Sequence, residues 1–164
     1  MKMLVVYGSK RGGTAGLAQM VGDALTEHRV DAVVQDARSA DAPDGYDAVI
    51  VAGALYANRW HRDARQFVRR HADALRERPV WFVSSGPLDR TARTGEIPAV
   101  RQVAKLMGRV GARGHMTFGG RLAPDAKGFP ASAMAKKHAG DWRDTDHVQA
   151  WIDGVTAELS TRPS

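Results

Sequence analysis

Short apolar runs alternate along this chain with segments whose apolar residues recur every three or four positions. The apolar runs predict strands at residues 3–7, 32–35, 46–52, 79–84 and 113–122. The three-to-four spacing predicts helices at residues 14–27, 62–75 and 97–110, and a last helix through Val148, Trp151, Ile152, Val155 and Leu159. Because the strands are continuously apolar, we expect both faces of their sheet to be covered. This pattern is typical of a parallel α/β sheet with helices on both sides.

Five predicted strands in 164 residues fit a doubly wound sheet of order 2-1-3-4-5 better than a six-stranded dinucleotide-binding sheet. We therefore expect a three-layer αβα sandwich in one domain, residues 1–160, followed by a frayed tail at residues 161–164. In such folds, ligands bind at the carboxyl ends of the strands. The candidate chemistry should accordingly lie in the loops that follow the first, third and fourth strands.

The loop after the first strand, in the stretch VVYGSKRGGT, has the composition of an anion site. Its hydroxyls, glycines and backbone N–H groups precede a helix, whose N-terminus attracts negative charge. A Walker A loop is excluded because the lysine comes before the glycine pair, and the spacing of G-x-G-x-x-G is also absent. The loop instead resembles the phosphate loop of flavodoxins, Thr/Ser-x-Thr-Gly-x-Thr, with arginine where that family has a hydroxyl. The alternative is an ordinary glycine-rich turn. The resemblance implies an FMN phosphate held by Ser9, Lys10, Arg11, Gly12, Gly13 and Thr14.

The loops after the third and fourth strands extend the resemblance. Their sequences are GALYANRWH, residues 53–61, and SSGPLD, residues 84–89. Flavodoxin-like proteins hold the isoalloxazine ring of FMN between loops at these two positions, so the resemblance implies the same here. Tyr56 and Trp60 offer flat faces for stacking, and packing onto the sheet is the alternative for both. The implied ring contacts are Ala54, Leu55, Tyr56, Ala57, Trp60, Ser84, Ser85, Gly86 and Pro87.

The middle of the chain, residues 53–84, has a closer resemblance. It is similar to the flavodoxin-like, menaquinone-dependent protoporphyrinogen dehydrogenase family. The shared features are the Gly53-Ala54 pair, an aromatic residue and His61 before a helix, and the run FVRRH at residues 67–71. The resemblance implies FMN as the cofactor and a two-electron oxidation of a reduced organic substrate.

Two later segments bear on this resemblance. The stretch DWRDTDHVQAW, residues 141–151, is similar to the end of that family. Members that oxidise protoporphyrinogen carry a long, basic, amphipathic insertion associated with the membrane and quinone. Residues 119–140 form a shorter basic segment at that place in this chain and predict no amphipathic helix.

His61 is the candidate catalytic residue, because it precedes a helix beside the implied ring site and could exchange a proton with a substrate. His71 falls on the apolar face of its predicted helix, which favours packing. The remaining histidines lack metal-ligand spacing, so we expect no metal site; they are His28, His115, His138 and His147. Basic residues on or beside the candidate loops either bind substrate carboxylates or form a solvated rim; they are Arg11, Arg59, Arg62 and Arg90.

Composition narrows the function classes. The chain has no cysteine, which excludes disulfides, thiol nucleophiles and cysteine-bound metal clusters, so redox chemistry needs a bound cofactor. No apolar run approaches the roughly 20 residues that cross a membrane. The chain begins directly with a strand pattern rather than a signal peptide. We therefore expect a cytoplasmic protein without an integral membrane segment, and the basic segment leaves peripheral contact with a membrane open.

The net charge of +6 favours anionic partners. The leading hypothesis is an FMN-dependent oxidoreductase for an anionic small molecule, with a quinone or a redox protein as its electron partner; a homodimer is compatible with the sequence. The second hypothesis is a flavodoxin-type electron carrier, although such carriers are strongly acidic. The third is a non-redox anion-binding or nucleic-acid-binding protein. Nucleic acid is disfavoured because basic residues do not interleave with aromatic ones as single-strand binding requires.

Overall fold

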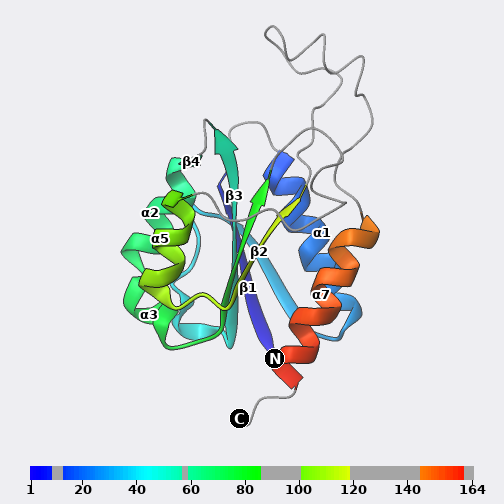
Figure 1. Ribbon diagram of the computed structural model, residues 1–164. Helices are drawn as coiled ribbons and strands as arrows, with labels where there is room; N and C mark the ends of the chain where they lie inside the picture. The colour runs from blue at the N-terminus through cyan, green and yellow to red at the C-terminus, as the bar shows by residue number, and fades with distance from the viewer. Residues whose placement is uncertain (9–12, 57–58, 86–100, 119–144, 161–164) are drawn as a thin grey trace, which may run out of the picture.

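The computed structural model describes residues 1–8, 13–56, 59–85, 101–118 and 145–160. Strands and helices alternate along these residues (Figure 1). Each predicted strand and helix has a counterpart among them. The elements in chain order are β1 Lys2–Gly8, α1 Gly13–Glu27, β2 Asp31–Asp36, the 3-10 turn η1 Pro43–Gly45, β3 Ala48–Tyr56, β4 Arg59–Trp60, α2 Arg62–Arg70, α3 Ala72–Arg76, β5 Val80–Ser85, α5 Arg101–Val110, β6 Gly114–Phe118 and α7 Thr145–Ser160.

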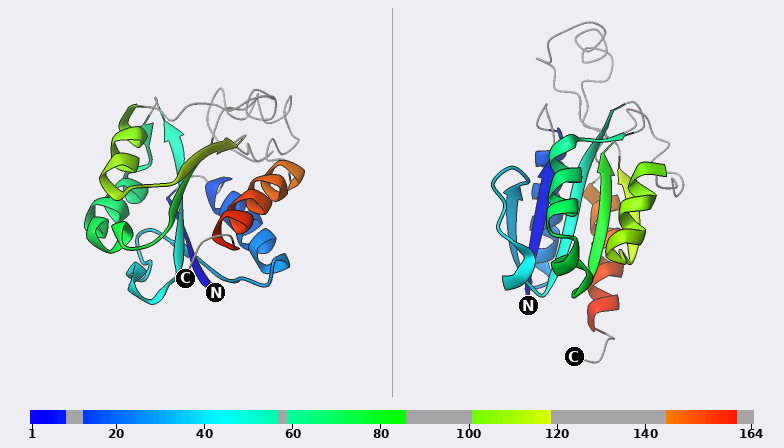
Figure 2. Two further views of the ribbon diagram at one scale, coloured as in Figure 1. Left: turned by 60° about the horizontal axis from the view of Figure 1, so that its bottom comes forward. Right: turned by 90° about the vertical axis from the view of Figure 1, so that its left-hand side faces the viewer.

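The sheet has the order β2-β1-β3-β5-β6, and all neighbours on this path are parallel. This is the predicted order 2-1-3-4-5, because β5 and β6 are the fourth and fifth parallel strands along the chain. Helices α1 and α7 cover one face, and α2, α3 and α5 cover the other, as Figures 1 and 2 show. The predicted three-layer αβα sandwich is confirmed.

The inner strands β1, β3 and β5 are buried on both faces, as their continuous apolar runs predicted, whereas the edge strands β2 and β6 are only partly buried. In β1, Met3 and Val5 belong to the cluster that includes α1 and α7, whereas Leu4 and Val6 belong to the cluster that includes α2, α3 and α5. All four side chains are 0% exposed. Each such burial contributes about 1.5–3 kcal/mol, so both helical layers hold the sheet and its carboxyl edge in place.

The main difference from the predicted elements is a hairpin at the end of β3. This strand runs on to Tyr56, beyond its predicted end at residue 52. β4 pairs with it in antiparallel orientation, with Leu55 opposite Trp60. A two-residue strand is too short for a periodic pattern to reveal. Part of the predicted loop is therefore a hairpin at the carboxyl edge.

The predicted helix over residues 62–75 is instead two helices, α2 and α3, which meet at His71. The backbone of His71 has φ −113° and ψ 24°, and its ring centroid lies 4.9 Å from that of Phe67. Ala72 and Leu75 of α3 are buried in the same cluster as α2. The hydrophobic pattern therefore continues across the break, which is why the sequence did not reveal it.

The remaining elements follow the prediction closely. In α5 the buried residues are Val103, Leu106 and Val110, whereas Ala104, predicted on the apolar face, is exposed. The predicted strand over residues 113–122 is β6. Positions 97–100, 119–122 and 161–164 of the predicted elements and tail lie outside the described residues.

Candidate functional site

The carboxyl edge of the sheet brings the predicted loops together. Gly8 of β1 lies opposite Gly53 of β3, which in turn lies opposite Ser84 of β5. The three strand ends from which those loops leave therefore form one row. Since ligands of this architecture bind at this edge, the row marks the candidate site.

Thr14 lies in the first turn of α1 at this edge, and its side chain is 1% exposed. Its hydroxyl oxygen has no hydrogen-bond partner among the described residues. A buried polar group left unpaired costs about 1–3 kcal/mol. The hydroxyl is thus available to an anion at the N-terminus of α1, where the helix dipole favours negative charge. Residues 9–12, the rest of the predicted phosphate loop before Gly13 of α1, lie outside the described residues.

The end of β1 also supports the start of α2. A Cβ added at Gly8 would lie 2.7 Å from the backbone nitrogen of Ala64, so the close contact requires glycine. The N-terminal ends of α1 and α2 thus lie at the same edge as the end of β1. Both helix ends carry partial positive charge, which favours an anionic ligand between them.

Trp60 is buried rather than presented to a ligand. Its side chain is 1% exposed, its ring centroid lies 4.7 Å from that of Phe82, and a Cβ at Gly53 would lie 2.7 Å from ring atoms of Trp60. Its indole nitrogen Nε1 donates to the hydroxyl of Ser84 at 2.9 Å. The structure therefore corrects the prediction that Trp60 offers a stacking face, because this ring packs onto the sheet.

Ser84 is likewise engaged inside the protein. It is 1% exposed, and its hydroxyl oxygen lies 2.8 Å from Nε2 of His115 as well as beside the Trp60 indole. The Ser84 hydroxyl is thus engaged within the protein, and the contact of Ser84 with FMN stays a prediction. Burial lowers the pKa of His115 to about 4. The sequence pattern did not assign His115 to the site. The available signal was that the predicted strand with His115 follows the strand with Ser84 and is its neighbour in the predicted sheet order.

His61 caps the N-terminus of α2. Its Nδ1 accepts a hydrogen bond from the backbone N–H of Asp63 at 3.2 Å, and the backbone N–H of His61 donates to the carbonyl of Ala54 at 2.8 Å. The side chain is 11% exposed. The structure thus places His61 at the carboxyl edge as predicted, fixed between the end of β3 and the start of α2.

Charged side chains surround His61. Its Nδ1 lies 3.6 Å from Oδ2 of Asp63, which lies 3.8 Å from Nε of Arg38. Arg38 also pairs with Asp36 at the end of β2, at 3.0 Å, and this hydrogen-bonded guanidinium lowers the pKa of the Asp36 carboxyl. The cluster alternates acids and bases, so its side chains neutralise one another while Arg38 stays exposed at the rim.

The other predicted residues divide between described and undescribed positions. Ala54 lies opposite Ser85 at the ends of β3 and β5, and Ser85 is 7% exposed. Leu55 is half-buried against the core, and Arg62 is exposed. Tyr56 and Arg59 are opposite each other at the tip of the hairpin. The predicted residues outside the described positions are Ala57, Gly86, Pro87, Arg11 and Arg90.

The described residues carry neither a membrane-spanning helix nor a metal-binding cluster. None of the helices described is both long and apolar enough to cross a bilayer. Within the same ranges, no three His, Asp or Glu side chains gather as metal coordination requires.

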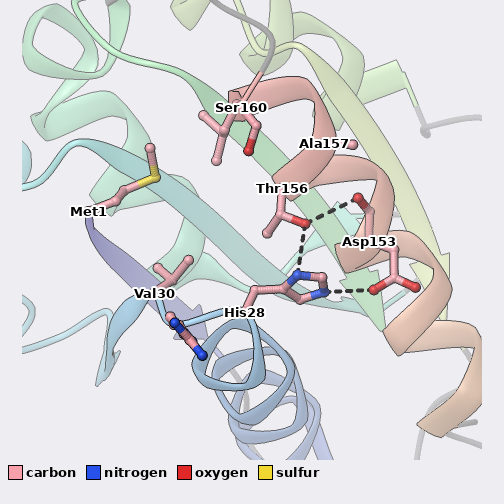
Figure 3. A pocket seen from close by; sticks show the side chains of 9 residues that line it. Met1, His28, Val30, Asp153, Thr156, Ala157 and Ser160 are labelled. Atoms are coloured by element: carbon pink, nitrogen blue, oxygen red, sulfur yellow. Dashed lines mark hydrogen bonds and ion pairs between the residues drawn. The ribbon is translucent and has the colours of Figure 1, made fainter.

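A hollow of about 430 Å³ lies at the opposite edge of the sheet, between the end of α1, the start of β1 and α7 (Figure 3). His28 crosses it: Nε2 lies 2.7 Å from Oδ1 of Asp153, and Nδ1 lies 3.4 Å from the hydroxyl of Thr156. Arg29 reverses the chain between α1 and β2 with φ 63°. Both ring nitrogens of His28 are engaged within the protein, in contrast to the unpaired hydroxyl of Thr14.

Comparison with known proteins agrees with this geometry. The family model of the flavodoxin domain matches residues 4–137. Protoporphyrinogen IX dehydrogenase (quinone) of Escherichia coli is 27% identical over 101 residues, which cover 57% of this chain and 56% of that protein. The match therefore spans little more than half the length of that relative.

Two solved structures share the fold. A short-chain flavodoxin associated with a non-canonical PDU bacterial microcompartment has a TM-score of 0.62 at 15% identity, covering 96% of this chain and 98% of that chain. A flavodoxin of Streptococcus pneumoniae has a TM-score of 0.59 at 18% identity, covering 96% of this chain and 99% of that chain. With a family match over most of its length and the same fold, the chain belongs to the flavodoxin-domain family, whose cofactor is FMN.

Proposed function

We propose that this protein binds FMN at the carboxyl edge of its sheet and uses it to oxidise a reduced, anionic organic substrate by two electrons. The observation that carries the proposal is the buried, unpaired hydroxyl of Thr14 at the start of α1, in a chain of an FMN-binding family. The similarity to a quinone-linked dehydrogenase supports oxidation of a small molecule as the reaction class.

The described residues fit FMN. Thr14 would donate to the phosphate, together with backbone N–H groups that the first turn of α1 leaves unpaired. The ends of β3 and β5, with Ala54 opposite Ser85, would hold the polar edge of the ring. When bound, FMN would supply the acceptor for two electrons and a proton from the substrate.

His61 would act on the substrate as a hydrogen-bond donor. Because Nδ1 accepts from the N–H of Asp63, the neutral ring carries its proton on Nε2. A donor at this position would orient an anionic substrate by a hydrogen bond from Nε2–H. The exposed guanidinium group of Arg62, which directly follows His61 in the chain, would attract the substrate's negative charge.

The net charge of the chain favours substrate oxidation over a pure electron-carrier role. The chain has a net charge of +6, which suits an anionic substrate better than docking onto a basic partner protein. The carrier function therefore stands as an outcome of the experiment below. In that case, the bound flavin would exchange electrons only with another protein.

The experiment begins with the visible absorbance of the purified protein after FMN is added and the excess removed. Under anaerobic conditions, protoporphyrinogen IX is then added, followed by a soluble quinone. We expect a retained flavin spectrum that is bleached by the substrate and restored by the quinone, without any reductase. Protein that retains no FMN would contradict the proposal that this chain is a flavoprotein. Retained FMN that only a flavodoxin reductase can reduce would favour the carrier.

His61→Asn is the variant that tests the role of His61 in the reaction. Asparagine is a good N-cap residue, so the start of α2 should be preserved while the imidazole is lost. We expect FMN affinity and stability close to those of the wild type, with kcat/KM lower by about tenfold, because the anionic substrate loses one hydrogen bond. Unchanged turnover in His61→Asn would remove His61 from the reaction.

A further inference from the structure

Trp60 is held from several directions at once. Its backbone N–H donates to Oε1 of Gln102 in α5 at 3.0 Å, and its carbonyl accepts from Nε of Arg65 in α2 at 3.1 Å. Its indole donates to Ser84 at 2.9 Å, and its ring lies against Gly53. The contacts join β4 to β3, β5, α2 and α5, so the position of this residue couples most of the layer on that face of the sheet.

The indole fixes the direction of the first side-chain hydrogen bond. An indole N–H can only donate, so the Ser84 oxygen accepts from Trp60 and its own O–H is left to donate. Nε2 of His115 lies 2.8 Å away, and burial keeps this imidazole neutral at neutral pH. In the tautomer with the ring proton on Nδ1, Nε2 accepts from the Ser84 hydroxyl. The chain therefore runs from Trp60 to Ser84 to His115, and each buried group has its partner.

The spacing of Ser84 and His115 is that of a nucleophile and its base, but their surroundings argue against that role. Ser84 is 1% exposed and Trp60, which covers its hydroxyl, is also 1% exposed. A substrate therefore has no access to the oxygen, which is already occupied by the indole N–H. The network acts within the protein.

The hairpin is the element that this network fixes. Trp60 directly precedes His61, the N-cap of α2, and pairs with Leu55 near the tip of β3. The N–H of His61 in turn donates to the carbonyl of Ala54. A shift of the Trp60 ring would therefore move both the end of β3 and the start of α2, the two segments beside the proposed FMN ring and substrate.

We propose that Ser84 and His115 are positioning residues: through the Trp60 indole they hold the β3–β4 hairpin in the place that FMN binding requires. This inference rests on the proposed function for its ligand, whereas the hydrogen-bonded network itself is independent of FMN. Neither residue touches the cofactor in this role.

The experiment compares three variants with one control. Ser84→Ala breaks the network, His115→Leu removes the acceptor at its end, and His115→Gln keeps an acceptor oxygen in a similar volume. Val155→Ala, in the apolar cluster on the other face of the sheet, destabilises the fold without touching the network. By fluorescence titration, Ser84→Ala and His115→Leu should bind FMN about tenfold more weakly, and His115→Gln and Val155→Ala within about threefold of the wild type.

Hydrogen exchange of the Trp60 indole N–H in cofactor-free protein supplies the second measurement. It should be faster in Ser84→Ala and His115→Leu, and near the wild-type rate in His115→Gln. A wild type that binds no FMN would defeat the proposed function, while the exchange rates would still decide whether the network holds the hairpin. Faster exchange with unchanged FMN affinity would overturn the positioning role, as would equal losses in His115→Gln and His115→Leu. Should Ser84→Ala not fold, the two His115 variants give the same decision.

Discussion

The two edges of the sheet carry the same kinds of polar residue in different states. At the amino edge, His28 bonds to Asp153 and Thr156 at the surface, around the hollow of Figure 3. At the carboxyl edge, His115 is held neutral beneath Trp60, and the Thr14 hydroxyl is buried without a described partner. One edge satisfies its polar groups with one another, and the other leaves a donor for a ligand.

Backbone packing differs in the same way. At the carboxyl edge, added Cβ atoms at Gly8 and Gly53 would lie 2.7 Å from neighbouring atoms, whereas at Gly154 of α7 nothing lies within 4 Å. Close approach of this kind occurs where the strands, hairpin and helix ends meet at the carboxyl edge, and also at Gly22 in α1, where an added Cβ would lie 2.7 Å from a side-chain methyl of Val34. Such tight packing is expected at functional sites, where the groups that meet a ligand must be held in fixed positions.

The largest effect should come from one methyl group at the carboxyl edge. Gly53→Ala would press on the Trp60 ring, which Phe82 and Ser84 hold in place. It should lower the free energy of unfolding by about 3 kcal/mol. The matched change, Gly154→Ala, should raise it by about 0.5–1 kcal/mol through helix propensity. Urea unfolding measures both, and similar stabilities for the two variants would contradict the difference in packing.

The next effect is a pH dependence from His115. Its pKa is lowered from 6.5 to about 4 in the folded protein, so the unfolded chain binds this proton first as the pH falls. Stability is therefore retained above pH 6.5 and lost between pH 6.5 and 4, by about 2 kcal/mol once partial exposure is discounted. Burial also lowers the pKa of His71, which adds a slope of the same sign.

His115→Gln isolates the contribution of His115, because His71 is common to both proteins. Urea unfolding at pH 7, 5.5 and 4.5 should show a smaller loss of stability in the variant than in the wild type. Parallel curves would mean that His115 is solvated in the folded state, and the buried network at the carboxyl edge would lose its support.

The fold could be predicted from sequence because its determinants are local and repeated. Continuous apolar runs such as Met3–Val6 require cover on both faces, and the helical spacing supplies that cover. The break at His71 and the hairpin at Tyr56 were missed for a different reason. The break leaves the apolar face of the two helices continuous, and a two-residue strand is too short to show a period, so neither is visible in the pattern.

The sequence located the candidate site but did not show which of its side chains face a ligand and which face the core. Strand ends predicted the edge, and in the structure the row from Gly8 through Gly53 to Ser84 brings those strand ends together. Whether an aromatic ring faces a ligand or the sheet depends on packing between distant segments, and Trp60 was placed wrongly for that reason. His115 joins the site only through the register of β5 with β6, which no local pattern encodes.

A smaller change at Thr14 should separate stability from binding. Thr14→Val keeps the shape of the side chain and removes the unpaired hydroxyl. We expect the cofactor-free protein to gain about 1 kcal/mol, since an orphaned buried group is lost. FMN affinity should fall about tenfold, because the phosphate loses a donor. Thermal unfolding and fluorescence titration test the opposite signs, and a drop in stability without FMN would show that the hydroxyl already has a partner.

The smallest effect is expected at the amino edge, where His28 and Asp153 are paired at 2.7 Å with side chains 34% and 64% exposed. A surface pair of this kind contributes about 0.2–1 kcal/mol, so a double-mutant cycle of His28→Ala and Asp153→Ala should give a coupling energy in that range. FMN affinity should not change in either variant, because His28 follows the last turn of α1, at the end of the helix opposite to Thr14. A weakened FMN complex in His28→Ala would mean that the two edges are coupled through α1, whose last turn precedes His28 and whose first turn holds Thr14. The two edges would then be one energetically coupled unit, rather than an edge whose polar groups bond to one another and a separate ligand-binding edge.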